Sequence, residues 1–438
     1  MQLFFTALLP APAFAAAVVA DLETFPQRAE AYMPANPDAP LARYEDQRVY
    51  AEEYLRNRFA PWQNEDISYL DLSLDRVVAF HAATAKKQHF TADGKPFPQA
   101  SMNRLLRNGF IDVEAVVPRP GVALTDADVR VLPTATALYT SAASAKGERG
   151  LLRLDALQNS AVKPGEPLAV YTMSQDSSWC FVATDSVVGW ISAKSVALVD
   201  EEFMDRVMHA PHLVAIRDNI RVDGAGGKRL CTVKMGALLP AEGPNVLLPV
   251  RGKQGLAEIV PYRASAEDFA PFPVPFTPRN ALRAVDQLIG ERYGWGGLDG
   301  LRDCSAMTRD YFALFGVWLP RNSGDQARTG ATLPLRNVQP GLRSQTIAER
   351  GVPFATLVHM PGHIMLYLGL YDGKPVVLHN MWGIRTTLPD GRTGRAVVGR
   401  TVITSLRAGA EIPNRAKTAL FIDNLAALAY PMANVGLQ

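Results

Sequence analysis

The spacing of apolar and polar residues gives the first part of the chain a helical character. Apolar residues recur every three or four positions, with charged residues between them, in the stretches 45–59, 74–80 and 101–106. This spacing gathers apolar side chains on one face of a helix. We therefore expect residues 21–118 to form a segment that is mainly helical.

The pattern changes after residue 118, where short β-type runs alternate with Gly and Pro turns. Residues 119–200 contain the runs V-R-V-L-P, P-L-A-V-Y-T, S-W-C-F-V-A and V-V-G-W-I, and residues 201–272 repeat the theme more faintly. Short strands separated by turn residues at this spacing are typical of small barrels. The sequence predicts two successive β-barrels, and we favour a core position over a ligand platform for Trp179 and Trp190.

The remaining residues, 273–438, mix helical and strand signals. A proline-rich stretch, 270–278, reads as a stiff linker and leads into a helical pattern over 279–289. Another helical pattern, over 415–428, is expected to pack on the domain. We predict an α+β domain here.

Composition narrows the range of functions. The chain has 438 residues, too many for a single core, and its 45 Lys and Arg nearly balance its 43 Asp and Glu. This balance gives no electrostatic reason to expect nucleic-acid binding. The three cysteines are widely spaced and lie in no zinc-ligand pattern, so we expect no disulfide framework, no metal and no cofactor.

Residues 1–20 are apolar and rich in alanine, with a small-x-small cleavage pattern at Ala13-Phe14-Ala15. They resemble a secretory signal peptide, although no Lys or Arg precedes the apolar run. Pro10 and Pro12 interrupt the run and argue against a membrane-spanning helix. We expect an exported protein of the periplasm or cell envelope, with no integral membrane segment in the mature chain; a buried or disordered N-terminus is the alternative.

Cys304 stands where a reactive cysteine belongs. A glycine-rich loop, Y-G-W-G-G-L-D-G, leads into Asp303-Cys304-Ser305, and an amphipathic run then extends to Gly316. Asp303 is a suitable N-cap, which places Cys304 in the first helical turn. Free backbone N–H groups and the helix dipole favour a thiolate there. A lone cysteine is more often a small buried hydrophobe, so the surrounding residues must decide between the two.

Two histidines lie downstream in strand-like runs, His363 in G-H-I-M-L-Y-L-G and His379 in P-V-V-L-H-N. Tyr371-Asp372-Gly373-Lys374 between them is a hairpin signal. A three-residue loop, 371–373, places Met365 opposite His379 and puts both histidines on one face, whereas a two-residue Asp-Gly turn puts them on opposite faces. Each histidine alone is more often structural. Together with Cys304 they suggest a nucleophile, a base and a residue that orients the base.

These blocks resemble the NlpC-type, papain-like cysteine peptidases of bacterial cell walls. Y-G-W-G-G, D-C-S, L-P-R-N-S-x-x-Q and G-H-I-M-L-Y-L-G occur in the order of that family's signature. The resemblance covers about the last third of the chain, and W-C-F-V-A-T with G-W-I-S resembles a bacterial Src-homology-3-type domain. It implies the following roles: Cys304 as nucleophile, His363 as general base, His379 as the orienting residue, and Tyr293, Asp303, Ser305 and Ser323 at the substrate cleft.

The insert 332–360 departs from the family pattern, because it lacks the Asp of the family's usual Pro-Gly-Asp.

The resemblance also implies the substrate: peptidoglycan stem peptides or muropeptides, cut between γ-D-glutamate and the diamino acid. Some such enzymes require a free N-terminal L-Ala, whose ammonium Asp303 and Tyr293 suit; helix capping is the other role open to Asp303. A cysteine amidase or transacylase, and a non-catalytic wall-binding protein, remain alternatives.

The fold class expected is α+β: a papain-like catalytic domain preceded by two small Src-homology-3-like β-barrels and an N-terminal helical segment. The predicted boundaries are 1–20 for the signal peptide, 21–118 for the helical segment, 119–200 and 201–272 for the barrels, and 273–438 for the catalytic domain.

Overall fold

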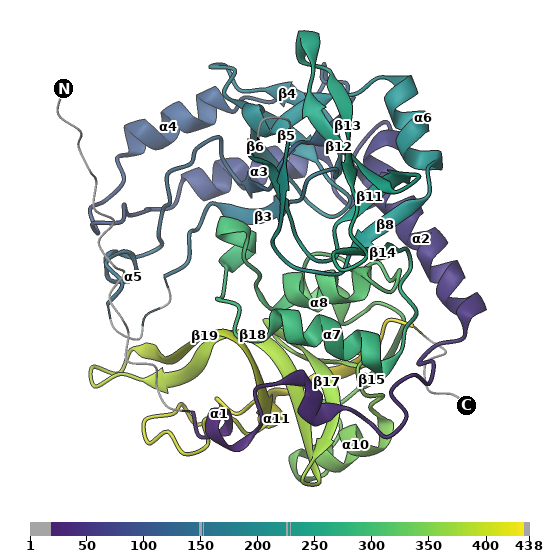
Figure 1. Cartoon of the computed structure of the whole chain (residues 1–438). Coiled ribbons are helices and arrows are strands. Elements are labelled where there is room, and N and C mark those ends of the chain that lie inside the picture. Colours follow the sequence, from purple (N-terminus) through teal and green to yellow (C-terminus); the bar gives the residue numbers. More distant parts are fainter. Residues whose placement is uncertain (1–18, 149–150, 152, 225–226, 228, 433–438) are drawn as a thin grey trace, which may run out of the picture.

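The computed structural model describes residues 19–148, 151, 153–224, 227 and 229–432. The prediction of a signal peptide over 1–20 falls almost entirely outside these residues. In Figure 1 the strands that follow the N-terminal helices occupy the upper half of the molecule, and the C-terminal sheet lies below them. Helices α7 (Pro278–Leu288) and α8 (Cys304–Ala313) lie between the two halves.

The N-terminal segment is helical, as predicted. Its helices are α1 (Asp21–Thr24), α2 (Tyr44–Gln63), α3 (Leu74–Ala85) and α4 (Gln99–Asn108). Ser73 caps α3 by accepting a hydrogen bond from the backbone N–H of Arg76. Val77 of α3 shares a core with Phe181 and Trp190 of the following β-rich part. The segment therefore packs onto its neighbour, and Trp190 is fully buried in the core, as predicted.

The first β-rich part is one antiparallel sheet with the order β3-β2-β6-β5-β4-β1-β7. Its strands are β1 (Arg119–Ala123), β2 (Ala127–Arg130), β3 (Gln158–Val162), β4 (Pro167–Met173), β5 (Trp179–Ala183), β6 (Val188–Ser192) and β7 (Val196–Leu198), and a short helix, α5 (Ala142–Ala145), lies in the loop before β3. The short strands between turns agree with the sequence pattern.

The second β-rich part follows helix α6 (Glu201–His209) and has its own apolar core. It consists of a five-stranded sheet, β13-β12-β11-β8-β14, and a two-stranded sheet, β10-β9. The strands are β8 (His212–Ala215), β9 (Ile220–Asp223), β10 (Arg229–Val233), β11 (Leu238–Glu242), β12 (Asn245–Arg251), β13 (Ala257–Arg263) and β14 (Phe269–Pro271). The stretch 270–278 was expected to be a stiff linker, but strand β14 and the buried Phe276, whose ring stacks on Phe315 at 4.3 Å, show that it is packed structure.

The C-terminal part is a six-stranded sheet, β15-β20-β16-β17-β18-β19, covered by α8. The strands are β15 (Ala331–Pro334), β16 (Leu357–Met360), β17 (His363–Tyr371), β18 (Lys374–Thr387), β19 (Thr393–Ser405) and β20 (Ala427–Tyr430), with α9 (Ser323–Gln326), α10 (Arg343–Arg350) and α11 (Phe421–Asn424) between them. Residues Met307, Tyr311 and Phe312 of α8 are fully buried against this sheet.

The helix predicted over 415–428 is wrong. Only α11 (Phe421–Asn424) is helical there, and the chain then enters strand β20. Backbone pairing of β20 with both β15 and β16 explains the difference. An alanine-rich segment with a helix-like pattern becomes a strand when it fills the gap between two others, because tertiary pairing overrides propensity.

Candidate active site

Cys304 is the first residue of helix α8. The Asp303 carboxylate caps the helix by accepting from the backbone N–H of Ala306 at 2.9 Å, as the sequence predicted. The glycine-rich loop before it lies on strand β3, where a Cβ added to Gly297 would lie 2.8 Å from Cβ of Ala161. Gly297 also has a φ of 84°, so this close approach depends on glycine.

His363 begins strand β17 and His379 lies in β18, and their common face has a different origin from the one predicted. The turn has two residues, Asp372 and Gly373, because Tyr371 pairs with Lys374. The three-residue loop is therefore wrong. A β-bulge at Leu368 supplies the extra residue instead, since Tyr367 pairs with Val377 and Gly369 with Val376.

Beyond the bulge Leu366 pairs with Leu378, and one further step places Met365 opposite His379. This is the predicted pairing, and it sets His363 diagonal to His379 on one face. Nε2 of His363 and Nδ1 of His379 lie 2.8 Å apart, at hydrogen-bond distance.

The hydroxyl of Thr404 fixes the direction of this hydrogen bond. It donates to the carbonyl oxygen of Ser405 at 2.8 Å, and its oxygen lies 3.0 Å from Nε2 of His379. That oxygen accepts from Nε2–H of His379, which leaves Nδ1 of His379 without a hydrogen. Nε2 of His363 must then be the donor. Nδ1 of His363 remains the acceptor, the form that a base requires.

The sulfur of Cys304 sits beside the start of β17. The backbones of Ile364, which follows His363, and of Ser305 act to lower the pKa of the Cys304 thiol. Burial, and then the charge of Asp303, nevertheless raise the pKa of the Cys304 thiol to about 12. Burial and neighbouring His359 lower the pKa of His363 to about 4. The thiol and the imidazole are therefore both neutral in the free site, because burial outweighs the thiolate stabilisation expected from the helix terminus.

A cleft of about 270 Å³ opens at these residues. Tyr293, Cys304 and His363 line it, and Trp382 packs edge-on against Tyr293 with 5.7 Å between ring centroids. Leu154, from the loop before β3, borders the cleft from the other half of the molecule. The cleft can hold a short peptide against the cysteine.

Asp303 and Ser305 lie behind the cleft and not in its lining. Both carboxylate oxygens of Asp303 are bonded to the Arg321 guanidinium, at 3.0 and 2.7 Å, and Oδ2 also accepts from the N–H of Gly296. The Ser305 hydroxyl lies 2.9 Å from Nη1 of Arg321. Ser323 begins α9 and is outside the lining. Binding of substrate by Asp303, Ser305 and Ser323 therefore stays a prediction.

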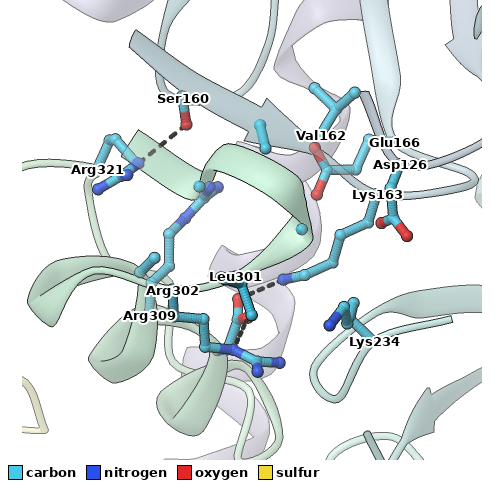
Figure 2. Close-up of a pocket in the computed structure, with 15 residues that line it drawn as sticks. Asp126, Ser160, Val162, Lys163, Glu166, Lys234, Leu301, Arg302, Arg309 and Arg321 are labelled. Carbon is cyan, nitrogen blue, oxygen red and sulfur yellow. Dashed lines mark hydrogen bonds and ion pairs between the residues drawn. The ribbon is translucent and has the colours of Figure 1, made fainter. Parts of the chain in front are cut away.

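Figure 2 shows how α8 is held against the first β-rich part. Lys163, just after β3, makes an ion pair with Asp310 of α8, and Arg302 donates to the same carboxylate at 2.7 Å. Arg321 also reaches Ser160 of β3, with 2.9 Å between Nε and Oγ. These side chains line a second cavity at the junction, and Cys304 is not part of its lining.

Sequence reasoning placed Arg321 in the L-P-R-N-S block but missed its pairing with Asp303, and it missed Thr404 altogether. Thr404 carries no local motif, and the partner of Arg321 lies 18 residues away.

Among the described residues, no group of three or more His, Cys, Asp or Glu side chains could hold a metal ion. In the same part of the chain, no helix combines the length and the hydropathy needed to cross a bilayer.

Comparisons with known proteins agree with this architecture. Residues 290–387 match the model of the NlpC/P60 family, residues 140–192 that of an SH3 domain of the SH3b1 type, and residues 4–113 that of the N-terminal NLPC_P60 stabilising domain. The gamma-D-glutamyl-L-lysine dipeptidyl-peptidase of Bacillus subtilis (strain 168) is 30% identical over 105 residues, which are 24% of this chain. The match spans about a third, 32%, of that relative.

Two solved structures are also similar. An NlpC/P60 endopeptidase from Photobacterium damselae subsp. piscicida is 22% identical with a TM-score of 0.83, over 94% of this chain and 98% of that one. An NlpC/P60 family protein from Bacillus cereus ATCC 10987 is 16% identical with a TM-score of 0.46, over 72% and 99%. The first likeness concerns the fold. The chain therefore carries a domain, residues 290–387, that matches the NlpC/P60 family, preceded by an SH3b-type domain and an N-terminal helical region.

Proposed function

We propose that the protein is a cysteine endopeptidase that hydrolyses peptidoglycan stem peptides at the bond between γ-D-glutamate and the diamino acid. The observation that carries the proposal is the directed chain Thr404–His379–His363 beside Cys304. It leaves Nδ1 of His363 as a base in the cleft that also contains the sulfur. The name of the Bacillus subtilis relative supports the choice of bond.

The reaction begins when Nδ1 of His363 takes the thiol proton as the sulfur attacks the γ-carbonyl carbon. Because thiol and imidazole are both neutral at rest, proton transfer accompanies attack. The backbone N–H groups at the start of α8 are the donors proposed for the oxyanion. His363 then gives its proton to the departing amine, which leaves a thioester on Cys304. A water molecule, deprotonated by His363, hydrolyses the thioester and frees the thiol.

The preferred substrates are freed muropeptides with an unblocked N-terminal L-Ala. Leu154, from the first β-rich part, and Trp295 both border the cleft, which supports this choice. The role that follows from such substrates is turnover or recycling of cell-wall fragments outside the cytoplasm. Cleavage at the sugar–peptide junction, or acyl transfer, would use the same Cys304 chemistry and remains the alternative.

Mass spectrometry of the products tests the proposal. The peptide L-Ala-γ-D-Glu-L-Lys is incubated with the protein, with the Cys304→Ala variant as control. We expect L-Ala-D-Glu and lysine from the first and intact peptide from the second. An N-acetylated peptide should be cut at least about tenfold more slowly if the free amine is recognised. Products cut at another bond, or equal products from the Cys304→Ala variant, contradict the proposal.

A further inference from the structure

Two arginines lie next to each other in the cleft that contains Cys304 and His363. Arg385 of β18 and Arg395 of β19 are direct partners in the antiparallel pair, and both line the cleft. Side chains of directly opposed residues leave the sheet on the same face, with Cβ atoms about 5 Å apart. Two guanidinium groups therefore share one wall of the site.

Arg385 is exposed at the cleft and Arg395 is half-buried, and their partners differ from those of the arginines that pack between the two halves of the molecule. Arg302, Arg309 and Arg321 each form an ion pair with an aspartate. For Arg385 and Arg395, the residues that the structure describes offer no carboxylate at ion-pair distance. The Arg395 guanidinium donates to the carbonyl oxygen of its neighbour Gly394 at 3.0 Å.

Like charges directly opposite each other destabilise a sheet. Burial, and then repulsion from Arg385, lower the pKa of Arg395, yet an arginine stays charged near neutral pH. An anion bridging the two groups would turn this repulsion into attraction. The planar guanidinium suits a carboxylate best, since it can form two parallel N–H···O bonds.

We propose that Arg385 and Arg395 form a carboxylate subsite that selects the anionic form of the substrate. This inference rests on the proposed function, because that function makes the cleft the peptide site. A stem peptide offers two carboxylates beside the bond to be cut: the α-carboxylate of the γ-linked D-glutamate and the carboxylate of the diamino acid. Their chemistry is shared, and the experiment distinguishes between them.

The kinetic test uses three forms of L-Ala-γ-D-Glu-L-Lys: the free acid, the peptide with D-isoglutamine in place of D-glutamate, and the peptide with a C-terminal carboxamide. For the unaltered protein we expect KM to rise about tenfold for the form that lacks the recognised carboxylate, with kcat nearly unchanged. In Arg385→Gln and Arg395→Gln this difference between acid and amide should shrink, and in the double variant it should disappear.

Arg400→Gln is the matched control. Arg400 lies on the same strand, β19, and is exposed, but it is outside the cleft lining. The Arg400→Gln variant should keep the preference for the free-acid peptide over the amide. Removing either cleft arginine should leave the melting temperature equal or higher, because a repulsion is lost. If a variant loses the preference for the acid and also has a lower melting temperature, its loss is attributed to misfolding. The single variant that keeps its melting temperature then tests the subsite.

Calorimetry with the Cys304→Ala variant separates this inference from the proposed reaction. If the peptides bind with a preference for the acid that the arginine substitutions abolish, the subsite stands even when no bond is cut. If the peptides are cut but acid and amide forms behave alike, the reaction stands and the subsite is overturned. A double variant that retains the acid preference also overturns the subsite. Absence of both binding and cleavage overturns both.

Discussion

The hydroxyl oxygen of Thr404 lies 3.0 Å from Nε2 of His379, on the side of the ring opposite His363. Thr404 and His379 are both fully buried, so no water competes for this contact. The position of one hydroxyl hydrogen, on Thr404, therefore selects the tautomers of both imidazoles. His363 can act as a base only because that hydrogen points to the carbonyl of Ser405.

Replacing Thr404 by valine should lower kcat and leave KM nearly unchanged. Valine has the same shape but cannot accept from Nε2–H of His379, and an unsatisfied buried donor costs about 1–3 kcal/mol. If that penalty falls on the active tautomer, kcat falls about 10–100-fold. Thr404→Ser keeps the hydroxyl and should restore most of the activity. Unaltered kcat in Thr404→Val, with normal stability, would show that Thr404 does not set the tautomer.

The thiol of Cys304 should react slowly with iodoacetamide at neutral pH. With its pKa at about 12 and that of His363 at about 4, the free protein holds thiol and neutral imidazole between these values. The thiolate fraction, and with it the labelling rate, should increase about tenfold per pH unit from pH 7 to 10. Mass spectrometry of labelled Cys304, with Cys304→Ala as blank, measures this rate. A plateau beginning near pH 5 would instead reveal a thiolate–imidazolium pair.

Protonation of His363 should set the acid limit of activity. Its pKa is lowered to about 4, so the imidazole is neutral above that pH and charged below it. We expect kcat/KM to fall by half near pH 4 and tenfold for each further unit, since the charged ring cannot take the thiol proton. A decline centred on pH 6.5, the usual histidine value, would mean that the ring is solvated in the active protein.

Local patterns predicted the elements of the site but not all of their connections. The N-cap Asp303 follows from residues close in sequence. The pairing of Met365 with His379 was expected from a three-residue loop, whereas the structure reaches it through a two-residue turn and a bulge. The bulge at Leu368 could not be foreseen, because it depends on how two strands fit and not on a turn residue. Thr404 gave no signal, since one threonine in a strand resembles any other.

Asp303→Asn distinguishes a structural role from a substrate-binding role. Asp303 and Arg321 are both buried and bonded through two oxygens, so the substitution leaves the guanidinium charge unpaired. Stability should fall by about 3–5 kcal/mol. Activity on peptides with free and acetylated N-termini should fall by the same factor. A loss confined to the free-amine peptide, with stability retained, would assign the carboxylate to the substrate ammonium.

The contact between Arg309 and Asp185 should hold the catalytic helix to the first β-rich part. Arg309 lies in α8, its guanidinium bonds both oxygens of Asp185 in the loop between β5 and β6, and Trp318 donates to the same carboxylate at 3.2 Å. Asp185 is buried, so Asp185→Asn leaves Arg309 charged in a dry environment. Urea unfolding should show a loss of about 3–5 kcal/mol.

Glu242→Gln provides the comparison. The substitution removes one charge from an exposed ion pair: the side chain of Glu242 is 67% exposed and that of Arg206 is 49% exposed. It should lower the free energy of unfolding by at most about 1 kcal/mol. If Asp185→Asn costs no more than Glu242→Gln, the buried pair does not hold the two parts together. If Asp185→Asn costs the larger amount and the two parts then unfold in separate transitions, the contact contributes to the coupling between them.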